Sequence, residues 1–215
     1  MENLSHSKKD KPLMVFFGKS KHLIEEFKDL YPNYNFYEIS WRNLNKTDMK
    51  VKADILVICG YDYSSSLYEF DKYFDVNVLN PLKIIDLICK KNTKIIYMNT
   101  YSDRIKKFTF SRYFYAKYFL KQKLINKYKN IKIIYLKTLV GHRGELLIHG
   151  NFLTKFIFST LLKIKVLNIT NINELNSLLK HSDKSITYTC NRIQPLGLKI
   201  PRTLLLDRFL RLIFG

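Results

Sequence analysis

Mostly apolar runs and helix-like segments alternate along the first two thirds of the chain. The runs are short and carry little of the in-and-out alternation that marks a half-exposed strand. Continuous runs of this kind are typical of parallel strands that are buried on both faces. The predicted strands are residues 13–17, 35–39, 53–60, 94–98 and 131–136.

Apolar residues at helical spacing fill the intervals between these strands and predict helices at 22–30, 69–90 and 113–128. Pro81 is expected to kink the second of them. Beyond Gly144 the pattern predicts a helix at 152–162, a strand at 165–169 and a helix at 171–179 capped by Asn171. Strands that alternate with helices indicate an α/β fold with right-handed crossovers.

The pattern also suggests where the chain divides. Residues 1–11 lack an apolar stretch, so we expect a flexible lead-in and not a signal peptide. Residues 12–144 carry the alternating pattern of one domain, and 145–215 form a shorter C-terminal segment packed on that domain. Residues 198–214 predict an apolar helix with a basic polar face. We favour packing on the domain or on a second subunit, with peripheral contact to an anionic membrane as the alternative.

A glycine turn joins the first strand to the first helix. Strand, glycine turn and helix open a Rossmann-type dinucleotide-binding unit, in which backbone N–H groups and the helix N-terminus hold a pyrophosphate. Gly18 would form the turn, Ser20 could bind phosphate, and Lys19 or Lys21 could supply positive charge. An ordinary turn without a ligand remains the alternative.

The end of the second strand bears on the choice of cofactor. An acidic residue here grips the ribose hydroxyls in NAD-binding units. Ser40 and Arg42 could instead receive a 2′-phosphate, which favours NADP, while Glu38 keeps NAD as the alternative.

Residues 94–117 hold the candidate chemistry. A buried strand ends at the hydroxyl residue Thr100, and the next helix carries Tyr113 and Lys117 four residues apart, on one face. A nearby ammonium lowers the pKa of a tyrosine, so Tyr113 could act as general acid or base while Thr100 holds a substrate oxygen. The spacing Tyr-x-x-x-Lys occurs three times in the chain, but only this copy follows a buried strand and a hydroxyl residue.

Four residues fall where predicted strands end: Gly18, Gly60, Thr100 and Gly141. Ligands of open α/β sheets bind outside the carboxyl ends of the strands. The sequence therefore predicts a doubly wound parallel sheet of Rossmann type, with a small C-terminal helical appendage and a ligand site at this edge.

Over residues 13–144 the chain resembles the short-chain dehydrogenase/reductase superfamily, in particular its sugar-nucleotide epimerase, dehydratase and reductase branch. Residues 95–100 resemble the strand that ends in the catalytic Ser or Thr, and 113–117 resemble the Tyr-x-x-x-Lys motif. The helix around Asn77 and the small residues beside Gly60 also match.

By that resemblance Tyr113 is the acid/base, Lys117 binds the nicotinamide ribose, and Thr100 orients a substrate carbonyl. The resemblance implies an NAD(P)-dependent reductase or epimerase of a nucleotide-linked keto sugar, used for surface polysaccharide, and a homodimer. The glycine-rich turn is reduced to Gly18, and the segment after Gly144 is short. A catalytically degenerate dinucleotide-binding or protein-interaction module is therefore the alternative.

Composition narrows the class of protein. The chain has 215 residues, is 47% hydrophobic and holds no apolar run long enough to span a membrane. Three scattered cysteines without metal-ligand spacing suit a reducing cytoplasm and predict no metal site. The formal charge of +19 comes from dispersed lysines, which usually mark solvated faces. We therefore expect a cytoplasmic protein without a nucleic-acid partner, and keep a basic nucleic-acid or membrane-surface protein as the weakest alternative.

Overall fold

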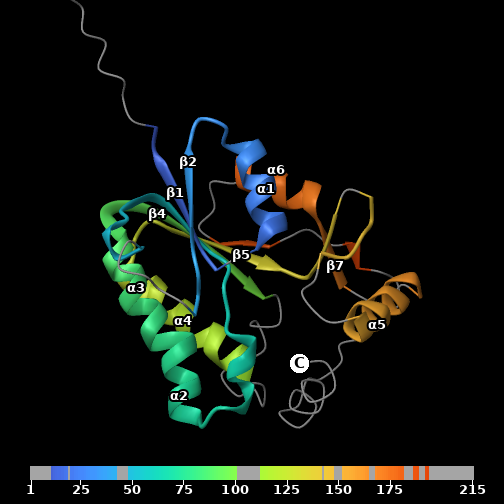
Figure 1. The fold of residues 1–215 in the computed structure, drawn as a ribbon. Helices are drawn as coiled ribbons and strands as arrows, with labels where there is room; N and C mark the ends of the chain where they lie inside the picture. The colour runs from blue at the N-terminus through green and yellow to red at the C-terminus, as the bar shows by residue number, and fades with distance from the viewer. Residues whose placement is uncertain are drawn as a thin grey trace, which may run out of the picture.

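The computed structural model describes residues 11–18, 20–42, 48–100, 112–141, 143–147, 152–164, 168–181, 186–188 and 192–193. Six parallel strands form its central sheet in the order β2-β1-β3-β4-β5-β8 (Figure 1). Their bounds are β1 Leu13–Phe17, β2 Asn35–Ile39, β3 Ala53–Ile58, β4 Cys89–Thr100, β5 Ile131–Leu136 and β8 Ile186–Tyr188.

The strand order reverses beside β1. From β1 the chain runs to one side to form β2 and then crosses to the other side to form β3. In doubly wound sheets such a reversal is the switch point, and it leaves a crevice at the carboxyl ends of the two central strands. In this chain the switch point lies between β1 and β3, so the crevice is expected between the ends of these two strands.

Helices cover both faces of the sheet (Figure 1). On one face α1 (Lys21–Leu30) and α6 (Ile172–His181) bury apolar residues against the sheet, and Asn176 of α6 donates a hydrogen bond of 3.0 Å to Glu26 of α1. On the other face α3 (Asn80–Ile88) and α4 (Arg112–Lys127) enclose a second apolar cluster. Two separate cores therefore hold the sheet from both sides.

A second, smaller sheet is formed by strands that come after β5 in the chain. Its strands β6 (Thr138–Val140), β7 (Asn168–Asn171) and β9 (Arg192–Ile193) lie in that order, and β6 pairs with β7 in parallel. The helix α5 (Phe152–Lys163) lies between β6 and β7 in the chain. Short 3-10 helices η1 (Asp48–Lys50) and η2 (Tyr63–Leu67) flank β3.

Most predicted elements are confirmed, and three details are wrong. The expected helix 69–90 consists of α2 (Phe70–Phe74), a π-helical turn η3 (Asp75–Leu79) and α3, which ends where a longer β4 begins at Cys89. Residues 138–140 form β6 of the second sheet, so Gly141 does not end a strand of the central sheet. The strand expected at 165–169 is β7, at 168–171.

Two predicted helix features can be compared directly with the structure. Asn171 does cap α6, since its side-chain oxygen accepts a hydrogen bond of 2.9 Å from the Asn173 N–H. The irregularity expected at Pro81 lies in the preceding turn, where the Asn80 N–H bonds the Asp75 carbonyl five residues back. Pro81 itself lies in the first turn of α3, where a helix tolerates proline.

Among the described helices, none combines the length and the apolar character needed to cross a membrane. Within the same residues no group of three or more His, Cys, Asp or Glu side chains could hold a metal ion. The predicted helix at 198–214 and all but the last residue of the lead-in predicted at 1–11 lie outside the described residues.

Candidate functional site

Two glycines meet at the switch point. Gly18, directly after β1, has a φ of +104°, a backbone conformation that glycine adopts readily and other residues rarely do. A Cβ atom added to Gly18 would lie 2.2 Å from the Cα of Gly60, which follows β3. The Gly60 N–H in turn donates to the Phe17 carbonyl at 3.1 Å. The ends of β1 and β3 are therefore in backbone contact, which side chains would prevent.

Trp41 covers the other side of Gly60. A Cβ atom on Gly60 would lie 2.2 Å from the indole Cε3 of Trp41. The indole stacks on Phe17 with ring centroids 4.5 Å apart, and its N–H donates a hydrogen bond of 3.2 Å to the Val76 carbonyl. Only 9% of Trp41 is exposed. Trp41, two residues after the end of β2, is thus packed into the core beside the crevice.

Helix α1 begins just after the Gly18 turn, where the sequence predicts a helix N-terminus that binds phosphate. Ser20 is the N-cap residue, but its side chain makes no capping hydrogen bond, and the first turn of α1 holds no acidic residue. Lys21 is largely exposed and forms a loose ion pair of 3.9 Å with Glu25. Lys19 lies outside the described residues.

Lys117 of α4 reaches the switch point. Its side chain is buried, with 4% of the residue exposed, and its Nζ donates a hydrogen bond of 3.1 Å to the Gly60 carbonyl. The same Nζ lies 5.3 Å from the ring centroid of Tyr97, whose hydroxyl donates to the Lys117 carbonyl at 3.3 Å. A buried ammonium group is thus held directly beside the contact between Gly18 and Gly60.

Tyr113 lies one helical turn before Lys117, as the spacing predicts. The Lys117 Nζ is 6.0 Å from the centroid of the Tyr113 ring. That ring packs edge-on against Tyr61 at 4.6 Å and stacks with Tyr63 at 6.1 Å. Thr100 is the last residue of β4 and pairs with Leu136 of β5. The three residues predicted for chemistry therefore lie on β4 and α4, which follow each other in the chain.

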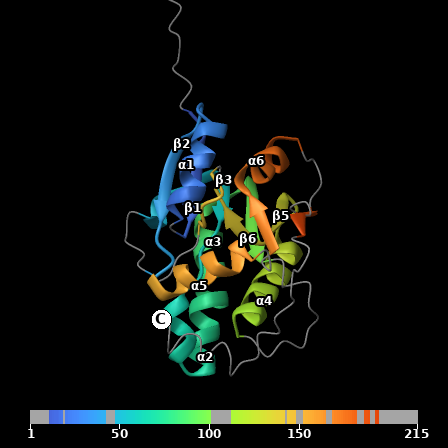
Figure 2. The same cartoon turned by 90° about the vertical axis from the view of Figure 1, so that its right-hand side faces the viewer.

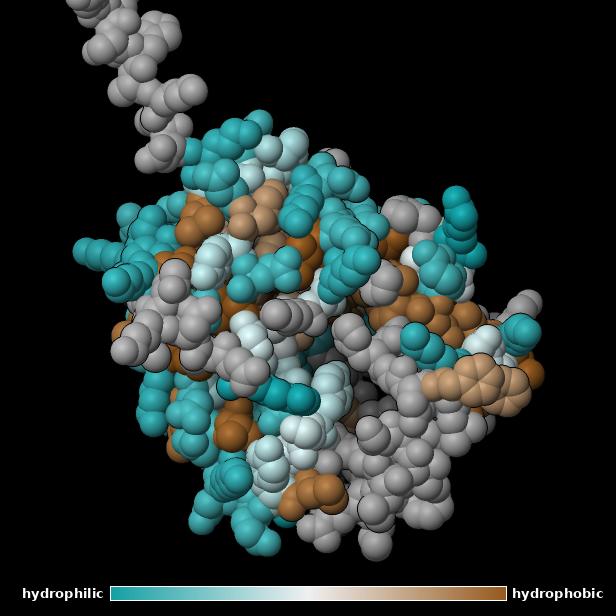
Figure 3. Space-filling model, in the orientation of Figure 1, coloured by the Kyte–Doolittle hydropathy of each residue, from teal (hydrophilic) through white to brown (hydrophobic). Residues whose placement is uncertain are grey.

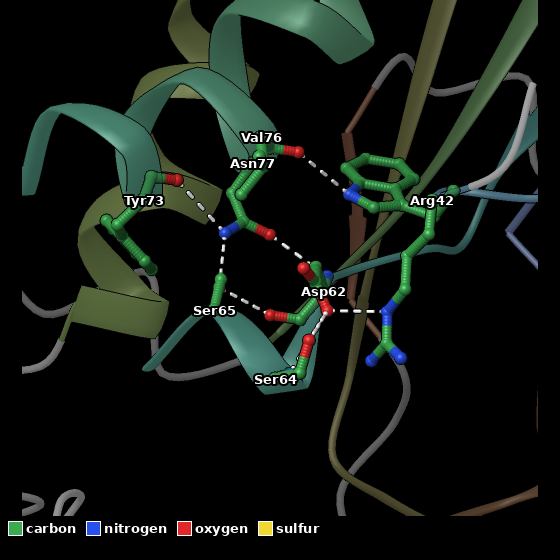
Figure 4. Close-up of polar contacts among 8 residues, drawn as sticks. Arg42, Asp62, Ser64, Ser65, Tyr73, Val76 and Asn77 are labelled. Carbon is green, nitrogen blue, oxygen red and sulfur yellow. Dashed lines mark hydrogen bonds and ion pairs between the residues drawn. The ribbon is translucent and has the colours of Figure 1, made fainter. Parts of the chain in front are cut away.

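Arg42 is engaged in an ion pair that the sequence did not reveal. Its Nε lies 2.5 Å from an Asp62 carboxylate oxygen, and the same oxygen accepts hydrogen bonds from the backbone and side chain of Ser64 (Figure 4). Asp62 is 4% exposed, so its carboxylate is nearly buried. The pair ties the end of β2 to the loop after β3. Ser40 lies two residues before Arg42, and Glu38 is exposed on β2.

Asn77 completes this network from the π-turn (Figure 4). Its side-chain oxygen accepts from the Asp62 N–H at 2.9 Å, and its amide nitrogen donates to the Ser65 hydroxyl at 2.6 Å and to the Tyr73 carbonyl at 3.1 Å. Two sequence signals pointed to Asn77: the resemblance of the helix around it, and its polar side chain in mid-helix. Asp62 with Ser64 two residues later is the Asx-turn pattern that could have indicated the rest.

A neutral thiol also borders the crevice. Cys59 Sγ donates a hydrogen bond of 2.9 Å to the Gly18 carbonyl. Burial raises the pKa of the Cys59 thiol to about 12, although the Lys117 ammonium acts in the opposite direction. At neutral pH the thiol is therefore protonated and serves as a hydrogen-bond donor.

The structure brings together Gly18, Gly60 and Lys117, with Tyr113 next to them on α4. Arg42 is joined to the same region through Asp62. Gly141 belongs elsewhere: it follows β6, and its N–H donates to the Glu145 carbonyl at 2.8 Å.

Comparison with known proteins gives structural matches only. No protein-family model matches the chain, and no curated protein matches it. The dTDP-4-dehydrorhamnose reductase of Bacillus anthracis, solved in complex with NADP, matches with a TM-score of 0.55 and 15% identity, over 84% of this chain and 75% of that one. The ADP-L-glycero-D-manno-heptose-6-epimerase of Helicobacter pylori matches with a TM-score of 0.57 and 11% identity, over 83% and 76%.

A third match names the superfamily directly. A short-chain dehydrogenase/reductase superfamily protein from Agrobacterium tumefaciens with bound NAD has a TM-score of 0.53 and 12% identity, and the match covers 93% of this chain and 82% of that one. At such identities the likeness concerns the fold. The chain therefore shares a Rossmann-type α/β fold with these proteins.

Proposed function

We propose that this protein is an NAD(P)-dependent oxidoreductase or epimerase that acts on a nucleotide-linked keto sugar. One observation carries the proposal: the ammonium of Lys117, from the Tyr-x-x-x-Lys helix, is buried against the Gly60 carbonyl at the switch point of the sheet. Dinucleotides bind outside the carboxyl ends of the strands at such a point. The candidate acid/base motif is therefore held beside the expected cofactor crevice.

The residues at the crevice fit a dinucleotide. Gly18 makes the tight turn, and the first turn of α1 carries neither a side-chain cap nor an acidic residue, so its N–H groups suit a pyrophosphate. Lys117 would hold the nicotinamide ribose. The cofactor supplies the hydride exchanged with the sugar carbon.

The remaining steps belong to the side chains of this chain. In the reductive direction Tyr113 would give its hydroxyl proton to the oxygen that develops negative charge, and Thr100 would donate a hydrogen bond that orients that oxygen. The positive charge of Lys117 favours the tyrosinate left behind. In the oxidative half of an epimerisation the same groups would act in reverse.

The similar proteins support this reading. A reductase and an epimerase of nucleotide-linked sugars share the fold, and the structures of two similar proteins hold NADP or NAD. For this chain we favour NADP, because Arg42 lies at the end of β2 with its guanidinium fixed through Nε to Asp62. The terminal nitrogens of such a fixed guanidinium, with Ser40, suit a 2′-phosphate.

One observation favours the degenerate module as a second candidate. The Trp41 indole contacts Gly60 and stacks on Phe17, so side-chain atoms fill one side of the crevice. A protein that had lost its cofactor could fill the vacated space in this way. A protein-interaction module would bind no nicotinamide dinucleotide, and a degenerate dinucleotide-binding module would bind one without turnover.

Turnover tests the chemistry. Nucleotide-linked keto sugars would be screened with NADPH and NADH by following absorbance of the reduced nicotinamide. We expect Tyr113→Phe to lose about 10²-fold or more in kcat, because it removes the proton donor. Tyr118→Phe on the same helix is the matched control and should retain activity. Equal activity of both variants would remove Tyr113 from the mechanism.

A further inference from the structure

Helix α5 presents apolar side chains to solvent. Phe152 is 84% exposed and Phe156 is 60% exposed, and their rings stack with centroids 6.4 Å apart. Ile164, just past the helix, is 55% exposed. The helix lies at the outside of the molecule in Figure 1 and faces the viewer in Figure 2. Contiguous exposed apolar side chains are typical of interaction surfaces.

These two rings do not belong to the face that packs on the domain. The opposite side of α5 carries its own apolar residues, Ile157, Phe158 and Leu161, and all of them are half-buried. The outward face also carries Lys155 and Lys163, both exposed. The helix is therefore apolar on both sides, with lysines only on the outer one.

Charge distinguishes α5 from other exposed apolar residues. Phe70 on α2 is 45% exposed but stands between Glu69 and Asp71. By contrast, residues 146–173 contain no Asp or Glu and carry three lysines, and the whole chain has a formal charge of +19. In Figure 3 apolar side chains reach the surface at the right-hand edge, over α5. A helix face that carries aromatic side chains and lysines, and no acidic residue, complements an anionic lipid surface.

We propose that the outward face of α5 docks this protein on an anionic lipid bilayer. Phe152 and Phe156 enter the boundary between headgroups and acyl chains, while Lys155 and Lys163 lie at the level of the lipid phosphates. The helix lies in the plane of the surface and does not span it. The proposal is independent of the proposed catalytic function, since it involves neither α4 nor the crevice.

The test is co-flotation of the full chain with vesicles at low salt. Vesicles of phosphatidylcholine alone are compared with vesicles of equal parts phosphatidylcholine and phosphatidylglycerol. We expect binding to the anionic vesicles only, and release on adding salt. No binding to anionic vesicles at low salt would overturn the proposal.

Two variants assign the binding to α5. Lys155→Glu with Lys163→Glu should weaken binding by about fivefold or more per lysine. Lys83→Glu with Lys123→Glu is the control, because it changes the net charge equally at exposed lysines of α3 and α4. Phe152→Ser with Phe156→Ser should weaken binding by about tenfold, whereas Leu87→Ser, at a residue 46% exposed on α3, should not.

The substituted side chains point outward, so the variants should keep the circular dichroism and unfolding midpoint of the parent protein. Equal loss in the α5 lysine pair and its control would reduce the effect to net charge and contradict the proposal. A change in self-association without any change in vesicle binding would show that the phenylalanines contact protein, which also contradicts it.

Discussion

The Lys117 ammonium donates a hydrogen bond of 3.1 Å to the Gly60 carbonyl, and this contact joins the candidate catalytic helix to the carboxyl edge of the sheet. Lysine is rarely fully buried, because removing an ammonium from water is costly. Function is a frequent reason to keep such a group. Substitution of Lys117 can therefore test whether its side chain serves folding stability or cofactor binding.

Lys117→Met should impair function more than folding. The lost hydrogen bond and the relieved desolvation of the ammonium oppose each other, so we expect the free energy of unfolding to change by less than about 1 kcal/mol. Cofactor affinity and turnover should fall at least tenfold. Urea denaturation and calorimetry measure the two effects. Leu120→Ala, at a core residue of the same helix, should instead cost about 3 kcal/mol. A comparable loss in both variants would assign Lys117 a structural role.

Gly18→Ala should destabilise the protein far more than Gly144→Ala. Both glycines have positive φ, +104° and +81°, so alanine is strained at either. Only at Gly18 would the new Cβ collide with backbone, 2.2 Å from the Gly60 Cα, whereas nothing lies within 4 Å at Gly144. We expect about 3 kcal/mol or more for Gly18→Ala and about 1 kcal/mol for Gly144→Ala. Chemical denaturation checks this, and equal losses would contradict the close contact.

The two cysteine thiols make stability depend on alkaline pH. Burial raises the pKa of Cys59 and of Cys89 to about 12 in the folded protein. An unfolded thiol has a pKa of about 8.5, so above that value only the unfolded state loses protons and stability falls as the pH rises toward the folded pKa. Between about pH 8 and pH 10 each thiol should remove roughly 1–2 kcal/mol.

Urea denaturation at both pH values measures this loss. Cys59→Ala should make the decline shallower than in the parent protein, and Cys89→Ala should do the same. Buried tyrosines add a background that Cys59→Ala leaves unchanged, whereas Cys89→Ala also alters Tyr128, whose pKa Cys89 helps to raise. If the parent and both variants decline equally, the thiols are not responsible.

The sequence was sufficient for the framework of the fold. Strands β1 and β5 have the predicted bounds because mostly apolar runs are typical of strands covered on both faces. Strand β2 also has its predicted bounds, although it lies at the edge of the sheet and is partly exposed. Helix α4 was predicted to within one residue at each end for a similar reason: its buried residues recur at helical spacing. Local periodicity carries this information, so no long-range contact was needed.

Features that depend on distant contacts were missed. The ion pair of Arg42 with Asp62 joins residues 20 positions apart through a loop that looked merely polar. Trp41 packs against Gly60 only because the strand order places β2 and β3 on either side of β1. The π-turn at Asp75–Leu79 shares its apolar spacing with an ordinary helix, so periodicity did not reveal it.

Isothermal titration calorimetry with NADPH and NADH tests the central claim most directly. The protein is the full chain, and the variants are Lys117→Met and its exposed neighbour Lys123→Met as the control. The account predicts micromolar binding, about −8 kcal/mol, that Lys117→Met weakens and Lys123→Met does not, with NADPH preferred. No heat of binding for either cofactor at millimolar concentration would contradict it, and would make the Thr100, Tyr113 and Lys117 set the remnant of a site whose cofactor crevice Trp41 has closed.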